Sequence, residues 1–166
     1  MYLGNADHGE TAQLDEQVAR AHELLARHLE GPVAAEPWVQ HVEYDAEIPR
    51  WYVRFGCDGR DAATIYFDLH QRTLRYEVYF LPHPPDPATN HVDLYRFLLT
   101  RNHDLYGARF SIGPDGDLYL VGRVALEHLT EVELDRIIGV LYQATEQWFQ
   151  PVVHLAFRRH EVSEKG

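Results

Sequence analysis

The sequence contains a single cysteine, Cys57, so no disulfide bond can form within the chain. No apolar run approaches the roughly 18 residues that a membrane span needs. The first residues lack the basic and apolar regions of a signal peptide, and no asparagine begins an N-x-Ser/Thr glycosylation site. These absences favour a protein of a reducing compartment, and we expect it in the cytoplasm.

Positive charge is also scarce. Lysine and arginine together number 15, against 26 aspartates and glutamates, and the formal net charge is −11. Such a surface repels nucleic acid phosphates and anionic lipids, so neither nucleic acid nor membrane is an expected partner. The same charge would suit a basic partner, or it would serve solubility alone.

No metal-binding pattern is present among the eleven histidines. No pair lies four residues apart on a helix, as H-E-x-x-H would require. His22 and His28 are six residues apart, as are His154 and His160, which places each pair on different helix faces. One cysteine cannot build a zinc thiolate site, and we expect no metal and no cofactor.

Catalytic motifs are equally absent. The sequence has no G-x-S-x-G nucleophile motif, and the glycine turn at 113–116 is no phosphate loop, because Pro114 removes an amide donor. Cys57 is interpreted as a packed residue at a strand end. Carboxylate pairs such as Asp58 and Asp61 are interpreted as solvated turn charges. We therefore expect no catalytic residue and no enzyme.

Helical periodicity begins after a predicted flexible tail over residues 1–10. Apolar residues then recur at spacings of three and four, which places them on one helix face; they are Leu14, Val18, Ala21, Leu25 and Leu29. The Gly31-Pro32 pair is expected to stop this helix. Residues 11–157 are predicted to form a single domain, followed by a polar tail over 158–166.

Strands are predicted next, from period-two alternation of apolar and polar residues. The runs cover 38–44, 51–55, 63–69 and 74–80, with short turns at 57–59 and 70–73. Short connections between alternating runs indicate an antiparallel meander. The four prolines of 82–87 then predict a stiff surface loop.

The second half is predicted to contain two helices and a hairpin. The middle helix starts at a Thr89 or Asn90 cap, runs to about Tyr106 and ends at Gly107. Runs 108–112 and 118–125 predict a β-hairpin. A capping box at 130–133 then starts the last helix, which we expect Pro151 to kink or end.

The predicted fold class is therefore α+β, with helix, antiparallel β-meander, helix, β-hairpin and helix in that order. Three or four strands precede the middle helix and two follow it. Helices interrupt the sheet without alternating with every strand.

This order resembles the type III secretion chaperone-like fold over roughly residues 12–150, and the second half resembles the YbjN family. The likeness is carried by Phe97-Leu98-Leu99 with Asn102, by Ala108-Arg109-Phe110-Ser111, by Asp117-Leu118-Tyr119-Leu120, and by Val124, Leu126, Leu129-Thr130 and Trp148-Phe149. It implies a dimer-prone chaperone or scaffold with no catalytic residues to carry over.

Two surfaces are predicted to bind other proteins. The first is the sheet face opposite the main apolar side, because tyrosine and arginine are frequent in binding hot spots. Its candidate residues are Tyr52, Arg54, Tyr66, Arg75, Tyr79, Tyr119 and Arg123. The alternative is that tyrosine favours strands and that the protein's own helices partly cover this face.

The second surface is the middle helix, which carries apolar residues on more than one side. Its candidate residues are Val92, Leu94, Tyr95, Leu98, Leu99 and Tyr106. A helix that is apolar on two sides needs two buried contacts, and a second copy of the chain would supply one of them. The alternative is that the last helix covers the second side.

We therefore expect a non-catalytic, chaperone-like or regulatory module that forms a homodimer and binds a segment of another protein. Exposed strand edges and the Tyr/Arg face suit strand addition or groove binding. A small-ligand sensor domain and a small enzyme with an unrecognised site are the alternatives. A deep apolar cavity with convergent polar groups would favour either alternative.

Overall fold

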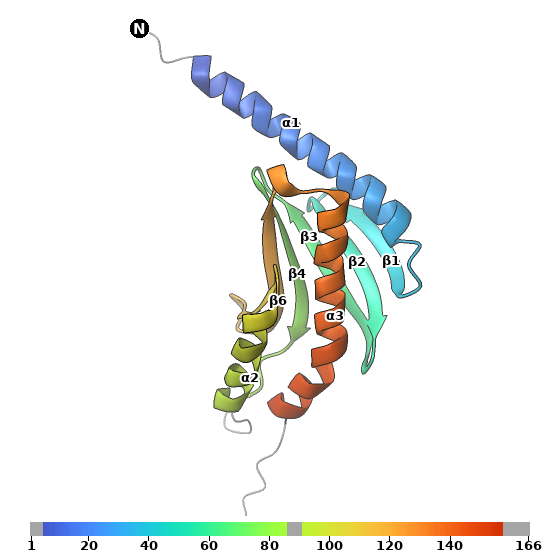
Figure 1. Cartoon of the computed structure of the whole chain (residues 1–166), viewed down its shortest axis with the longest axis vertical. Coiled ribbons are helices and arrows are strands. Elements are labelled where there is room, and N and C mark those ends of the chain that lie inside the picture. Colours follow the sequence, from blue (N-terminus) through green and yellow to red (C-terminus); the bar gives the residue numbers. More distant parts are fainter. Residues whose placement is uncertain (1–4, 86–90, 158–166) are drawn as a thin grey trace, which may run out of the picture.

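The fold is an antiparallel sheet with three helices, as seen in a computed structural model that describes residues 5–85 and 91–157 (Figure 1). The elements are α1 Asn5–His28, β1 Val39–Asp45, β2 Arg50–Cys57, β3 Arg60–Leu69, β4 Thr73–Leu81, α2 His91–Asp104, β5 Arg109–Ile112, β6 Leu118–Ala125 and α3 Glu131–Ala156. The strand order is β1-β2-β3-β4-β6-β5, with every pair antiparallel. The predicted α+β class, meander and hairpin are confirmed.

One face of the sheet forms the core, because every second side chain of the central strands points to it. The buried residues of this face are Trp51, Val53, Phe55, Ala63, Ile65, Phe67, Leu74, Tyr76, Val78, Phe80, Leu118 and Leu120. The register aligns them across the strands, with Ile65 opposite both Val53 and Val78. Each large side chain buried in this way contributes roughly 1.5–3 kcal/mol.

Helix α3 lies across this apolar face (Figure 1). Its buried residues recur at helical spacing; they are Leu134, Ile137, Ile138, Leu141, Ala144, Thr145, Val152 and Ala156. Thr145 has no access to solvent, and its hydroxyl donates a hydrogen bond of 2.7 Å to the Leu141 carbonyl oxygen. The helix therefore buries a polar side chain without leaving it unsatisfied.

The predicted cap of α3 is half confirmed. The Thr130 hydroxyl accepts a hydrogen bond from the Glu133 amide at 3.1 Å. The Glu133 carboxylate accepts from the Arg136 guanidinium instead of reaching back to Thr130, and this partner lowers the pKa of Glu133. Pro151 does not end the helix, which continues to Ala156.

Helix α1 begins earlier than predicted, because residues 5–10 are helical where we expected a tail. It ends at His28, and a π-helical turn over Leu29–Val33 then carries the chain through Gly31-Pro32, where we expected helical structure to stop. At its lower end α1 is tied to α3: the buried His28 lies 2.6 Å from an Asp135 oxygen, and Arg27 donates to Glu131 at 2.7 Å.

Helix α2 ends at Asp104, two residues before the predicted end, and Gly107 follows with a φ of 73°. The Tyr76 hydroxyl donates to the Gly107 carbonyl oxygen at 2.6 Å, which fastens the α2–β5 connection to the sheet. To reach it, the Tyr76 ring passes over Gly122 of β6. A Cβ at Gly122 would lie 2.3 Å from both the ring and the Gly107 oxygen.

Four predictions fall partly or wholly outside the described residues. These are the first four residues of the 1–10 tail, the last two residues of the 82–87 loop, the Thr89 or Asn90 cap and the 158–166 tail. Residues 82–85 carry no helix or strand, as the prolines predict.

We predict opposite stability effects for two glycine-to-alanine substitutions. Gly122→Ala should lower the free energy of unfolding by about 1–3 kcal/mol, since the new methyl group displaces Tyr76 from its place against Gly107. Gly139→Ala should raise it by up to about 1 kcal/mol, because Gly139 lies within α3 with open space around it. Urea denaturation of both variants measures the difference, and equal effects would contradict the packing described here.

Candidate functional site

The second face of the sheet carries the seven residues predicted to bind a partner. The register places Tyr52 opposite Tyr66, Arg75 opposite Arg123, and Tyr79 opposite Tyr119. Arg54, Arg75 and Arg123 are exposed, and the four tyrosines are half-buried. The structure thus brings all seven to one face, which α3 does not cover. We call this surface the open face.

Near β2 and β3 the open face is built around Tyr66. The Tyr66 ring meets the Tyr52 ring edge-on at 5.3 Å, and the Arg50 guanidinium lies over it at 5.2 Å. Arg50 also donates two hydrogen bonds to Asp68, at 2.6 and 2.9 Å. This bidentate pair raises the pKa of Arg50 and holds its guanidinium over the aromatic ring.

Near β4 and β6 the open face contains a second tyrosine pair. The Tyr79 and Tyr119 rings meet edge-on at 5.3 Å. Both hydroxyls donate to carboxylates of the β5–β6 turn, Tyr79 to Asp117 at 2.9 Å and Tyr119 to Asp115. These two tyrosines therefore hold the hairpin turn over the sheet as well as facing solvent.

The ionisation of these groups follows from the hydrogen bonds. Partial burial and the bond to Asp117 raise the pKa of Tyr79. The bond to Asp115 raises the pKa of Tyr119 and lowers that of Asp115. Period-two spacing located the tyrosines, but it gave no sign of their aspartate partners, which lie in a turn.

The β5 edge of the sheet is closed by a side chain of α2. Asn102 accepts a hydrogen bond from the Phe110 amide at 2.6 Å and donates one to the Phe110 carbonyl oxygen at 3.1 Å. It thereby occupies backbone groups that a further strand would use. The expectation of strand addition therefore does not hold at Phe110. β1 forms the other edge (Figure 1).

Of the six residues predicted to form the dimer surface on the middle helix, the structure buries some and exposes others. Leu94 and Leu98 are buried inside the subunit, so they are not available to a second copy, and that part of the prediction is wrong. α2 packs against α3, where the Phe97 ring lies 5.7 Å from that of Trp148, as the alternative reading required. Tyr95 is half-buried and contacts His83 at 2.5 Å.

The three remaining residues of that set stay exposed. Val92, Leu99 and Tyr106 expose 65%, 68% and 71% of their surface. Their spacing of seven places Val92 and Leu99 on one side of α2 and continues to Tyr106 beyond its end. This stripe, and not the whole helix, is the apolar surface available to a partner.

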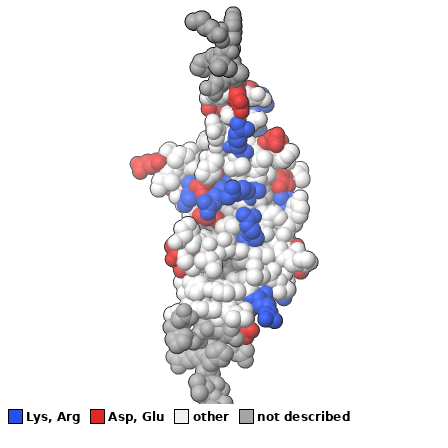
Figure 2. All heavy atoms as spheres, turned by 90° about the vertical axis from the view of Figure 1, so that its left-hand side faces the viewer, with Lys and Arg blue, Asp and Glu red and all other residues white. Residues whose placement is uncertain are grey.

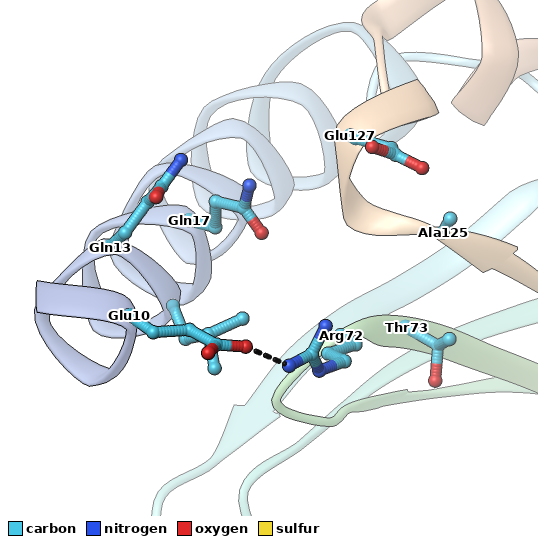
Figure 3. A pocket seen from close by; sticks show the side chains of 8 residues that line it. Glu10, Gln13, Gln17, Arg72, Thr73, Ala125 and Glu127 are labelled. Atoms are coloured by element: carbon cyan, nitrogen blue, oxygen red, sulfur yellow. Dashed lines mark hydrogen bonds and ion pairs between the residues drawn. The ribbon is translucent and has the colours of Figure 1, made fainter. Parts of the chain in front are cut away.

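A hollow of about 390 Å³ lies between α1 and the β3–β4 turn (Figure 3). Its lining is mainly polar, with Gln13, Gln17 and Glu127 around it, and the Arg72 guanidinium donates to Glu10 at 2.8 Å across one side. The pair leaves little net charge to attract an ionic ligand. The hollow does not have the apolar walls that a sensor or enzyme pocket would have.

The surroundings of Cys57 and of the possible metal ligands bear on the predicted lack of catalysis and metal binding. Cys57 is half-buried at the end of β2, and burial raises the pKa of its thiol. Among residues 5–85 and 91–157, no three His, Cys, Asp or Glu side chains come together to hold a metal ion. In the same ranges, no helix has the length and apolar character to cross a bilayer.

Comparison with known families and proteins gives a consistent set of relatives. Residues 38–153 match the YbjN family, described as "Putative bacterial sensory transduction regulator". The uncharacterized protein Rv0487 of Mycobacterium tuberculosis is 35% identical over 119 residues, which are 72% of this chain and 63% of that protein. The chain therefore spans less than two thirds of the length of this relative.

Solved structures share the fold at low sequence identity. The ExsC–ExsE complex and the HopA1–SchA chaperone–effector complex each contain a chain with a TM-score of 0.54 and 16% identity. Each match covers 81% of this chain, and 95% and 97% of the respective structures. The resemblance to the type III secretion chaperone fold is thus confirmed for the architecture.

We predict that Asn102 stabilises the domain through β5. Asn102→Ala should lower the free energy of unfolding by about 1–3 kcal/mol, because the Phe110 amide and carbonyl lose their side-chain partner. His103→Ala is the matched control, since His103 is the next residue and is exposed. Thermal or urea denaturation measures both variants, and an Asn102 variant as stable as the control would refute this role.

Proposed function

The chain belongs to the YbjN family, and from this premise we propose that it is a cytoplasmic, non-catalytic module that binds a segment of another protein. The open face is the observation that carries the proposal. A sheet that is covered by helices on one side and displays paired tyrosines and arginines on the other provides contact area with directed hydrogen bonds. We assign the binding role to Tyr52, Arg54, Tyr66, Arg75, Tyr79, Tyr119 and Arg123.

The structural relatives support a protein partner over a small molecule. Both the ExsC–ExsE and HopA1–SchA structures are complexes, and the second is named as a chaperone with its effector. The family description as a regulator of sensory transduction supports a regulatory outcome of binding. Chaperoning and regulation both begin with the same step, which is capture of a partner segment.

The second part of the proposal is a homodimer formed through the exposed stripe Val92, Leu99 and Tyr106. Apolar side chains exposed to more than 60% gain stability when a second copy removes them from water. A twofold interface pairs the same stripe on both subunits, so each residue has a matching surface. This arrangement leaves the open face available to the partner.

The binding role is tested with a partner captured by the full chain from an extract of its organism of origin and identified by mass spectrometry. Tyr66→Ala should weaken the affinity for that partner by about 1–2 kcal/mol, because Tyr66 offers its ring at the centre of the β2–β3 half of the face. Calorimetric titration of the purified pair measures the change.

Val132→Ala serves as the control for that titration. Val132 exposes 79% of its surface at the start of α3 and lies outside the open face, so its removal should leave the affinity unchanged. Equal affinity in the Tyr66 variant and the wild type would contradict the proposed binding face. Tyr79 is less suitable for the test, since its hydroxyl also holds Asp117.

The dimer is tested by Leu99→Glu. Leu99 is 68% exposed, so the charge should leave the subunit folded while placing like charges opposite each other in the dimer. Multi-angle light scattering at high micromolar concentration should give the mass of two chains for the wild type and of one chain for the variant. A wild type that is monomeric under these conditions would refute the dimer.

A further inference from the structure

Three arginines surround a hollow on the open face, over β4, β6 and β5. The hollow measures about 440 Å³, and Arg75, Arg109 and Arg123 line it together with Glu77, Tyr119 and Val121. Val121 and the Tyr119 ring contribute apolar surface, and the guanidinium groups contribute charge. Arg109 was not among the predicted site residues, because β5 is too short for its alternation to assign a face.

The arrangement of these arginines carries a cost in the free protein. Arg75 and Arg123 are direct partners on the neighbouring strands β4 and β6. Like charges in directly opposite positions of an antiparallel pair destabilise a sheet. Places where a sequence breaks a local rule of this kind are frequently functional.

The two halves of the open face differ in how their arginines are neutralised. Arg50 is held by Asp68, and Arg75 donates to Glu77 at 2.8 Å. Arg109 and Arg123 are exposed, and their guanidinium groups make no hydrogen bond or ion pair with any residue of the described ranges. The hollow therefore holds two guanidinium groups that no carboxylate binds, beside the Arg75–Glu77 pair.

This charge stands out on an acidic chain. The formal net charge is −11, and Lys165 is the single lysine, so arginines supply nearly all of the positive charge. Figure 2 shows basic side chains gathered near the middle of the side of the molecule on which β6 lies. Arginine, unlike lysine, binds a carboxylate through two parallel hydrogen bonds.

We propose that the Arg75–Arg109–Arg123 hollow binds carboxylate side chains of the partner, and that the captured segment is therefore short and rich in Asp and Glu. The inference rests on the proposed function and specifies its partner. A compact acidic segment fits better than a nucleic acid, because an extended polyanion would also meet the acidic remainder of the surface. The apolar surface of Val121 and Tyr119 favours a peptide over a small inorganic anion.

The probe is a fluorescein-labelled octapeptide of alternating glutamate and threonine, titrated with the full chain and followed by fluorescence anisotropy. A peptide with glutamine in place of glutamate is the uncharged control. The acidic peptide should bind and the glutamine peptide should not, and binding should weaken as salt is raised because the site is exposed. Lack of binding by the acidic peptide would overturn the proposal.

The site is located with matched charge removals. The double variant Arg109→Gln/Arg123→Gln should bind the acidic peptide about tenfold more weakly or worse, since it loses two charge-assisted contacts. The double variant Arg20→Gln/Arg27→Gln removes the same two charges from the exposed surface of α1, away from the open face, and should leave binding unchanged. An equal loss in both variants would show unspecific attraction and would overturn the assignment.

Two further measurements separate competing explanations. Thermal denaturation of the double variant should give a midpoint no lower than that of the wild type, because the repulsion between Arg75 and Arg123 is relieved. Inorganic phosphate at the same ionic strength as added chloride should compete no better than chloride. Stronger competition by phosphate would identify a phosphate site and would overturn the carboxylate assignment.

The outcome is distinguishable from that of the proposed function. If the acidic peptide fails to bind while the captured partner still depends on Tyr66, the open face remains the binding site and only the acidic character of the segment is wrong. If the peptide binds in the hollow while Tyr66→Ala leaves partner affinity unchanged, the charge site stands without the wider face.

Discussion

The two-residue alternation of β2, β3, β4 and β6 is the constraint on which the rest of this structure depends. It sends one set of side chains under α3 and the other set to the open face, and the antiparallel register keeps each set aligned from strand to strand. A slip of one residue in any pair would exchange the two faces of that strand. The core and the candidate binding surface are therefore determined together.

Several contacts hold the end of the sheet where β6 and β5 follow β4. The Tyr76 hydroxyl reaches Gly107 over Gly122, Asn102 occupies the backbone of Phe110, and Tyr79 anchors the turn through Asp117. Each contact joins different elements or turns, and together they fix the short strand β5 and the hollow beside it. Three residues of the YbjN resemblance, Asn102, Phe110 and Asp117, make two of these contacts. That part of the resemblance thus reflects a packing requirement of this end of the fold.

The sequence alone was sufficient to predict most helices and strands, but it was not sufficient to predict which side chains contact one another in the folded domain. Periodicity located the strands and the buried side of α3, because burial acts on each residue according to its face. The apolar pattern of α2 assigned too many residues to the dimer surface. Leu94 and Leu98 are buried within the subunit, but their apolar character alone does not show whether they contact α3, the sheet or a second copy. Periodicity also misplaced the start of α1, because residues 5–10 have no apolar spacing to mark the helix. Arg109 was missed because β5 is too short for its alternation to assign a face, and Asp115 and Asp117 were missed because strand periodicity does not describe the side chains of a turn.

Charge and shape divide the open face into two halves. Around Tyr66 the arginine is already neutralised by Asp68, so this half offers mainly aromatic contact area. Around Arg123 two guanidinium groups have no carboxylate partner, so under the proposed function this half would select by charge. A partner segment that crosses the strands would meet both halves in succession. An acidic protein that places unpaired arginines in one hollow would repel most other acidic surfaces, while it would retain a local attraction for a segment that reaches that hollow.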